Sequence, residues 1–166
     1  MLPRILVLAE RLALALWIGG LVGFAFLFAP VAFATIPDLA TFARLIGREL
    51  LALARFGYVC GAVALIALGW RARIAPVRGT MIRAALVLAM LVLVAIETRI
   101  VVPQMGRLLS AIDAPLGTLA RTDSRRAAYD AEHRRSSTIY GAVLVLGLLA
   151  FAAAGSERPP VRRRFG

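Results

Sequence analysis

LALALWIGGLVGFAFLFAPVAFATI, the stretch from residue 12 to residue 36, contains 25 consecutive residues without a charged side chain. A membrane-spanning helix needs about 20 apolar residues, because each residue adds about 1.5 Å and the hydrocarbon core of a bilayer is about 30 Å thick. The stretch therefore predicts a spanning helix over about residues 12–34. Because this helix is longer than necessary, we expect it to tilt, or to kink at Pro30.

Three further apolar stretches predict spanning helices over about residues 50–70, 84–105 and 136–155. The fold class that follows is all-α, a polytopic four-helix transmembrane bundle formed by residues 1–155. The loop over residues 106–135 is expected to be partly helical, with Thr122 or Asp123 as the N-cap of a helix that continues into the last span.

The composition agrees with a membrane protein. Of 166 residues, 61% are hydrophobic and 17% are charged, against about 25% charged in soluble domains, and the mean hydropathy is +0.83. These values exclude a disordered chain and argue strongly against a soluble globular domain. The single cysteine, Cys60, excludes an intramolecular disulfide framework and a cysteine-based zinc site.

The 20 basic residues are all arginines, and with nine acidic residues they give a net charge of +11. Arginines are densest near the N-terminus, in the short loop 71–83 and in the tail 156–166, which all lie on one membrane side. The positive-inside rule therefore predicts that both termini are cytoplasmic. We expect the membrane to be a bacterial inner (plasma) membrane. Beside a membrane span, the tail is expected to contact anionic lipid and not nucleic acid.

Small residues spaced four apart predict close helix packing, because helices in lipid associate through tight contacts. The pairs are Gly19 with Gly23, Gly57 with Gly61, and Ser137 with Gly141. We expect contacts within one chain, with homo-oligomerisation as the alternative.

Polar residues gather at one end of the predicted bundle. The C-terminal ends of helices 12–34 and 84–105 lie on the same membrane side as the N-terminal ends of helices 50–70 and 136–155. The opposite half is almost wholly apolar and is expected to be sealed. A candidate binding pocket at the polar end comprises Arg55, Glu97, Arg99, His133, Ser136, Ser137 and Tyr140.

Glu97 is the most informative of these residues, because it lies about 12 Å inside the predicted helix and its side chain is too short to reach water. A structural ion pair and a ligand or proton site are both open. We expect a pair with Arg55 and not with Arg99, since residues two apart on a helix point about 200° away from each other. Arg99 is close enough to the helix end to snorkel.

The residues give little support for an enzyme or a metal centre. His133 is the only histidine, which excludes a bis-histidine haem and a multi-histidine metal site. Met105 near His133 would suit Cu(I), but two ligands are a weak basis, and we predict no metal and no cofactor. An enzyme acting on lipid would need an acid/base pair, which only Glu97 with His133 supplies.

Three sequence motifs resemble a known family. They are Trp17-Ile-Gly19-Gly20 followed by Pro30 and Phe33, Glu97-Thr-Arg99 followed by Pro103, and His133-Arg-Arg-Ser136. Together they are similar to the four-span family called domain of unknown function 4149, which includes eukaryotic transmembrane protein 205 and many small bacterial proteins. The resemblance covers about residues 10–152 and implies a four-helix membrane bundle without an established reaction. The layout is also similar to that of copper-resistance D membrane proteins.

Three functions remain in view. The first is a bundle that binds or transports a small solute, ion or lipid in a one-sided polar pocket. The second is a non-catalytic membrane scaffold that binds a partner. The third is a membrane protein that handles copper.

Overall fold

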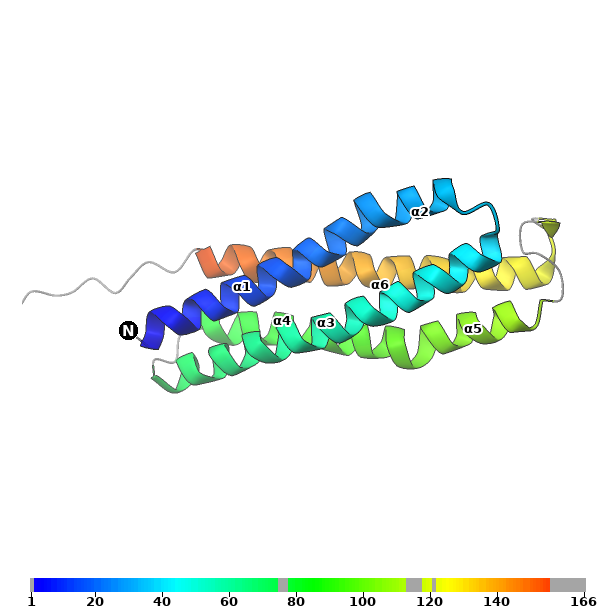
Figure 1. Cartoon of the computed structure of the whole chain (residues 1–166). Coiled ribbons are helices and arrows are strands. Elements are labelled where there is room, and N and C mark those ends of the chain that lie inside the picture. The colour runs from blue at the N-terminus through cyan, green and yellow to red at the C-terminus, as the bar shows by residue number, and fades with distance from the viewer. Residues whose placement is uncertain (1, 75–77, 113–117, 121, 156–166) are drawn as a thin grey trace, which may run out of the picture.

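The computed structural model describes residues 2–74, 78–112, 118–120 and 122–155, and these residues form a bundle of four long helices (Figure 1). The first span comprises α1 (Leu2–Gly23), η1 (Phe24–Phe28) and α2 (Ala29–Thr35), and the second is α3 (Leu39–Ile74). The third comprises α4 (Arg78–Ile96), η2 (Glu97–Val101) and α5 (Val102–Ser110), and the fourth is α6 (Ser124–Gly155). All four are long and apolar enough to cross a bilayer, so the predicted all-α fold is confirmed and the chain is a multi-pass membrane protein.

Every helix extends beyond the range expected from the charge-free stretches. The largest difference is at α3, which begins at Leu39 and not near residue 50. Its start is capped by Asp38, whose carboxylate accepts hydrogen bonds from the backbone N–H groups of Ala40 and Thr41. The helices therefore include charged residues that flank the apolar stretches. A prediction based on charge-free stretches ends each helix at the first charge and is too short.

Asp123 is the N-cap of α6, as one of the two alternatives predicted. Its carboxylate accepts a hydrogen bond from the backbone N–H of Arg125 at 2.8 Å, and its carbonyl accepts one from Ala127 at 2.9 Å. The helix then continues without interruption to Gly155. The basic tail, residues 156–166, lies outside the described residues.

Two spans contain a π-helical turn, and each turn immediately precedes a proline-containing segment. The turn η1 precedes Pro30, and the backbone N–H of Ala29 bonds to the carbonyl of Phe24; η2 precedes Pro103, and Val102 N–H bonds to the carbonyl of Glu97. Proline lacks an N–H, and its ring clashes with the carbonyl four residues earlier. The wider π turn accommodates that clash. The irregularity of the first span near Pro30 is therefore a π-helical turn just before the proline.

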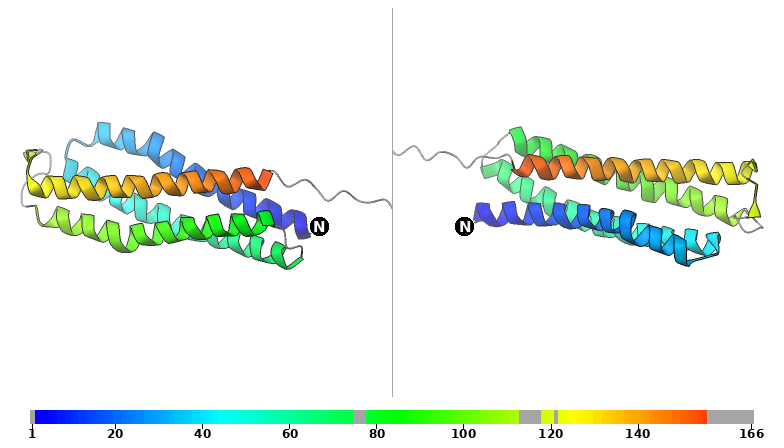
Figure 2. Two further views of the ribbon diagram at one scale, coloured as in Figure 1. Left: turned by 180° about the vertical axis from the view of Figure 1, so that it is seen from behind. Right: turned by 90° about the horizontal axis from the view of Figure 1, so that it is seen from above.

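The four spans separate into two pairs at one end of the bundle. The helix α1 packs against both α3 and α6, and α4 packs against α3 and α6. Beyond Gly23 the first span diverges from the rest of the bundle, as the left view of Figure 2 shows, and α2 keeps contact with α3. At this end α2 and α3 form one pair and α5 and α6 form the other. The N-terminus and the end of α6 lie at the opposite, closed end (Figure 2).

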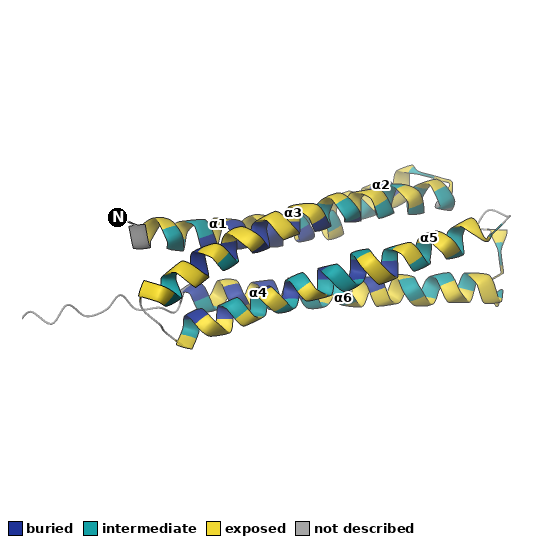
Figure 3. Ribbon diagram, turned by 90° about the horizontal axis from the view of Figure 1, so that it is seen from below, coloured by how far each residue is buried: buried dark blue, intermediate teal, exposed yellow. Residues whose placement is uncertain are grey.

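The core lies in the closed half, and many large hydrophobic side chains are exposed on the outer faces of the helices. Figure 3 shows the exposed residues in yellow. Trp17, Leu14, Leu68, Met90 and Val143 are fully buried in the closed half. A bundle with apolar side chains both inside and outside is the arrangement that a lipid environment requires.

Only some of the predicted small-residue contacts are formed. A Cβ atom at Gly57 would lie 2.7 Å from Nε1 of Trp17, and one at Gly61 would lie 2.6 Å from Cδ2 of Leu91, so these two glycines allow close packing. The expectation was wrong for Gly19, Gly23 and Gly141, where a Cβ atom would meet no atom within 4 Å. Sequence spacing alone does not say which face of a helix meets a neighbour.

The closed end also contains a buried ionic cluster, formed by residues just outside the apolar stretches that the sequence predicts to span the membrane. The carboxylate of Glu10 lies between the guanidinium groups of Arg71 and Arg83; Arg83 Nε is 2.8 Å from Glu10 Oε1. Glu10 and Arg83 are completely buried. Arg83 and Arg11 also donate to the carbonyls of Ala153 and Ala154, at 3.3 and 2.7 Å, near the end of α6. These carbonyls lack partners within their own helix.

Candidate functional site

A cavity of about 740 Å³ lies between the two helix pairs at the open end of the bundle. Its walls come from all four spans, and along α6 it extends from Arg126 to Leu144. At 1.5 Å per residue this is about 27 Å, most of the thickness of a bilayer core. The lining residues on the first three spans include Leu21, Phe24, Ala29, Phe33, Phe42, Ile46, Gly47, Leu50, Val102, Met105 and Leu109.

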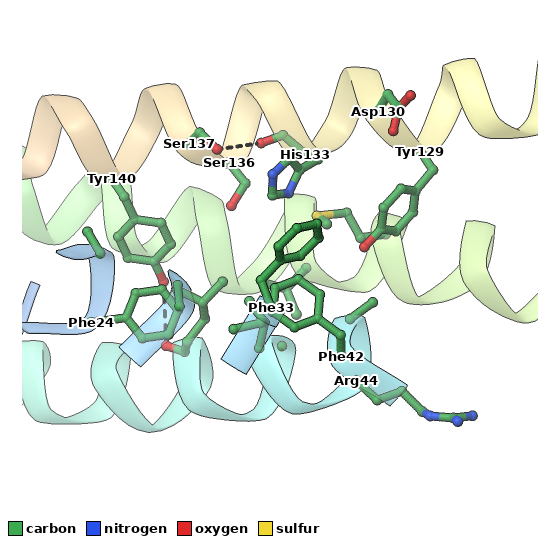
Figure 4. Close-up of a pocket in the computed structure, with 18 of the residues that line it drawn as sticks. Phe24, Phe33, Phe42, Arg44, Tyr129, Asp130, His133, Ser136, Ser137 and Tyr140 are labelled. Carbon is green, nitrogen blue, oxygen red and sulfur yellow. Dashed lines mark hydrogen bonds between the residues drawn. The ribbon is translucent and has the colours of Figure 1, made fainter. Parts of the chain in front are cut away.

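Aromatic and aliphatic side chains form most of the cavity wall. Phe33 of α2 and Phe42 of α3 meet edge to face, with ring centroids 5.3 Å apart and ring planes at 76°. This contact joins α2 to α3 in the cavity wall opposite α6 (Figure 4). Phe33 is 64% exposed, so it stands at the rim and is accessible from outside the bundle. The charged groups of Arg44 and Asp130 point away from the cavity in Figure 4.

The polar part of the wall belongs to α6. His133, Ser136, Ser137 and Tyr140 are spaced at i, i+3, i+4 and i+7, so they share one helical face, and all four line the cavity (Figure 4). The structure thus brings together four of the seven candidate residues. They lie near the middle of α6, since Ser136 is about 18 Å from the first residue of the helix.

Glu97 lies behind this wall and is completely buried. Its Oε1 atom accepts a hydrogen bond from the hydroxyl of Ser136 at 2.6 Å. Its Oε2 atom has no hydrogen-bond partner among the described residues. Because Ser136 both lines the cavity and bonds to Glu97, the serine connects the cavity to a buried carboxyl group.

The expected ion pair between Glu97 and Arg55 is wrong. Arg55 is exposed on the outer face of α3, whereas its neighbours Ala54 and Gly57 face the bundle. The hydrogen bond that joins this part of α3 to η2 is instead formed between Tyr58 and Thr98, at 3.0 Å. The estimate of depth along the helix did not determine which way around the helix Arg55 points.

Arg99 is also exposed and does not line the cavity. Its position matches a side chain that extends along the lipid-facing surface. Of the residues in the family motifs, Trp17 is buried in the core and Phe33 lines the cavity. Gly20 packs against Leu53, since a Cβ atom there would lie 3.1 Å from its Cδ1.

Sequence reasoning missed the wall that α3 contributes, because residues 39–49 were assigned to a loop. Phe42, Ile46 and Leu50 recur every four residues, and Ala43 and Gly47 follow on the same face. This periodicity, which follows the capping residue Asp38, is the sequence signal from which an amphipathic helix over residues 39–49 could have been predicted. Tyr129, which points toward the cavity in Figure 4, was also missed.

Within the described part of the chain, no three His, Cys, Asp or Glu side chains lie close enough together to hold a metal ion. His133 and Met105 line the same cavity, so the two soft candidate ligands do share one space. The prediction of a protein without a metal or cofactor stays a prediction.

Residues 12–112 match the family described as domain of unknown function (DUF4149). The match covers more than half of the chain, which therefore belongs to this family, and the resemblance seen in the sequence motifs is confirmed. It includes the first span from residue 12 onward and all of the second and third, and it ends before α6 with its polar cavity residues. No curated protein and no solved structure matches the chain.

Proposed function

We propose that this member of the DUF4149 family is a non-catalytic binding protein that takes an apolar or amphiphilic small molecule from the bilayer into the cavity between its helix pairs. The observation that carries the proposal is the cavity itself. Its volume of about 740 Å³ is in the range of small-molecule sites, which extend over about 300–1,000 Å³. It lies within the spanning segments and not in a loop exposed to water.

The wall chemistry selects an apolar ligand. Phe24, Phe33, Phe42 and Met105 offer aromatic and thioether surface. Apart from Arg44 of α3, whose charged group points away from the cavity in Figure 4, the polar lining residues lie on one face of α6. Such a wall does not replace the hydration shell of an inorganic ion or a sugar. It does replace the lipid environment of a hydrocarbon chain, and specificity then comes from the polar groups.

The divergence of α2 from α6 provides a route from the bilayer. The helix α2 contacts α3, where Phe33 meets Phe42, and Phe33 at the rim is exposed. A molecule already dissolved in the hydrocarbon core reaches this rim without crossing water. The start of α1 and the end of α6 lie at the same end of the bundle, and we propose that this end is on the cytoplasmic side of a bacterial inner membrane.

Binding of tritiated hexadecanol to the protein in phospholipid nanodiscs tests this proposal. A leucine at Gly141 or Gly47, on opposite walls of the cavity, narrows the space between the helix pairs, and a first added carbon meets no neighbouring atom at either position. Gly19→Leu is the matched control, because Gly19 is also open in a spanning helix but lies outside the cavity. We expect the two cavity variants to lose binding and the control to retain it.

Equal binding by Gly141→Leu, Gly47→Leu and Gly19→Leu would show that the probe does not occupy the cavity. The scaffold function would then be favoured, since a scaffold needs no ligand between its helices. Reporter fusions after Gly155 test the orientation separately, and activity of an externally exposed reporter would reverse it.

A further inference from the structure

The hydroxyl groups of Ser136, Ser137 and Tyr140 all lie in the cavity wall, and each gives its proton to an acceptor of the protein. Ser136 donates to Glu97 Oε1 at 2.6 Å, Ser137 donates to the carbonyl of His133 at 3.0 Å, and Tyr140 donates to the carbonyl of Leu50 at 3.4 Å. A hydroxyl has one proton and two lone pairs. Each of these oxygens is therefore left with the capacity to accept.

The bond from Ser136 fixes this polarity most firmly. It is the shortest of the three, and it is buried. Releasing the Ser136 proton toward a ligand would leave both oxygens of Glu97 without a partner, since Oε2 already has none among the described residues. The Ser136 oxygen thus presents lone pairs and not a proton.

We propose that the ligand of this cavity is a hydrocarbon-chain molecule that carries a hydrogen-bond donor, a hydroxyl or an amine, and that Ser136 is the residue that selects it. This inference rests on the proposed function and specifies its ligand class. An acceptor in an apolar cavity gains most from a donor, because an ether, ester or ketone oxygen leaves the lone pairs unpaired.

The other polar groups described around the cavity do not place a group that can only donate beside the Ser136 oxygen. The imidazole of His133 faces the same space and is able to accept as well as donate (Figure 4). The Tyr129 hydroxyl, a donor, belongs to a residue seven positions earlier on α6, about 10 Å nearer the loop end. Arg126 lies farther still and donates to the carbonyl of Leu119 at 2.7 Å.

Displacement of tritiated hexadecanol from the protein in nanodiscs tests the donor requirement. Unlabelled hexadecanol and hexadecylamine each offer a donor on the same chain, whereas hexadecyl methyl ether keeps the oxygen and lacks the proton. We expect the alcohol and the amine to compete and the ether to bind at least about tenfold more weakly, as expected when a buried acceptor loses its partner.

Variants assign the preference to named oxygens. Ser136→Ala is expected to bring the affinities of alcohol and ether together, and Ser137→Ala to bring them closer in a protein whose fold is unchanged, because Ser137 is exposed and bonds only within its helix. Thr138→Ala is the matched control. Thr138 makes the same bond to the carbonyl four residues earlier, at 2.9 Å, but does not line the cavity.

Equal affinity of wild-type protein for the alcohol and the ether would overturn the donor requirement and leave the cavity proposal standing. A preference for the alcohol that survives in full in Ser136→Ala would overturn the assignment to Ser136. Absence of binding by all three compounds would overturn both the inference and the proposed function.

Discussion

Arg83 of α4 and Glu10 of α1 face each other across the closed end of the bundle, with Nε 2.8 Å from Oε1 and both side chains completely buried. Arg71 of α3 contacts the other oxygen of the same carboxylate, so one acidic group joins three spans. A charge inside a membrane bundle is costly unless it is paired. This cluster therefore holds the closed end together while the opposite end diverges around the cavity.

Removing one member of this cluster is expected to destabilise the protein strongly. Arg83→Leu leaves the Glu10 carboxylate buried with fewer partners, and breaking such a buried pair costs about 3–5 kcal/mol. Thermal unfolding of the detergent-solubilised protein is the measurement. Arg73→Leu, an exposed arginine on the same turn of α3 as Arg71, is the control and is expected to change little. Additive effects of Glu10→Leu and Arg83→Leu in the double variant would show that the two are not coupled.

Ser136→Ala is expected to destabilise the bundle by about 1–3 kcal/mol, because it removes the hydrogen-bond partner of a buried Glu97 oxygen. Arg55→Leu is expected to be nearly neutral, since Arg55 is exposed on the outer face of α3. The two variants, compared by thermal unfolding, separate the observed partner of Glu97 from the one expected from sequence. A large loss of stability in Arg55→Leu alone would contradict the arrangement described above.

Gly57→Ala is expected to destabilise the protein by about 1–3 kcal/mol, because the added Cβ atom would lie 2.7 Å from Nε1 of the buried Trp17. Gly19→Ala, in the same membrane environment, adds a carbon where no atom lies within 4 Å. It is expected to be neutral or to stabilise its helix slightly, since alanine favours helix more than glycine. Unfolding temperatures in one detergent provide the comparison, and equal losses in both variants would be evidence against the Trp17 contact.

The start of α6 is expected to lose stability in acid. Hydrogen bonds from Arg125 to the Asp123 carboxylate lower the pKa of Asp123 from 3.8 to about 2, and the Thr41 hydroxyl lowers the pKa of Asp38 at the start of α3. A carboxyl group whose pKa is lower in the folded state stabilises the fold above its unfolded pKa and loses this effect as the pH falls through the folded pKa.

The affected window is therefore between about pH 4 and pH 2. Amide hydrogen exchange at Arg125 and Ala127 should accelerate over this range. Asp123→Asn keeps a capping side chain without an ionisable group, so its exchange should depend less on pH. An identical pH profile in wild type and variant would rule out Asp123 as the source.

The basic tail is expected to bind anionic lipid. Truncation after Gly155 removes Arg158, Arg162, Arg163 and Arg164, each contributing about 1 kcal/mol near an anionic surface. The truncated protein should keep its unfolding temperature and show lower affinity for anionic nanodiscs, with the difference reduced at high salt. Loss of folding on truncation would contradict this separation of tail and bundle.

The sequence by itself determined the membrane class, the number of spans and their order, because these depend on the length and composition of local segments. It also placed the α6 residues His133, Ser136, Ser137 and Tyr140 on one face, since the period of a helix is fixed. The irregularities at Pro30 and Pro103 follow from the missing N–H of proline in the same way.

Only the tertiary structure decided which faces of the helices meet. The sequence places Arg55 and Glu97 at similar depths, but the rotation of α3 about its axis directs Arg55 outward. Glu97 accepts a hydrogen bond from Ser136 instead. Glu10, Arg71 and Arg83 are far apart in sequence, and each lies near a helix end where a charge is ordinary. Their burial, like the cavity between the helix pairs, depends on the relative rotation and divergence of whole helices, which local periodicity does not encode.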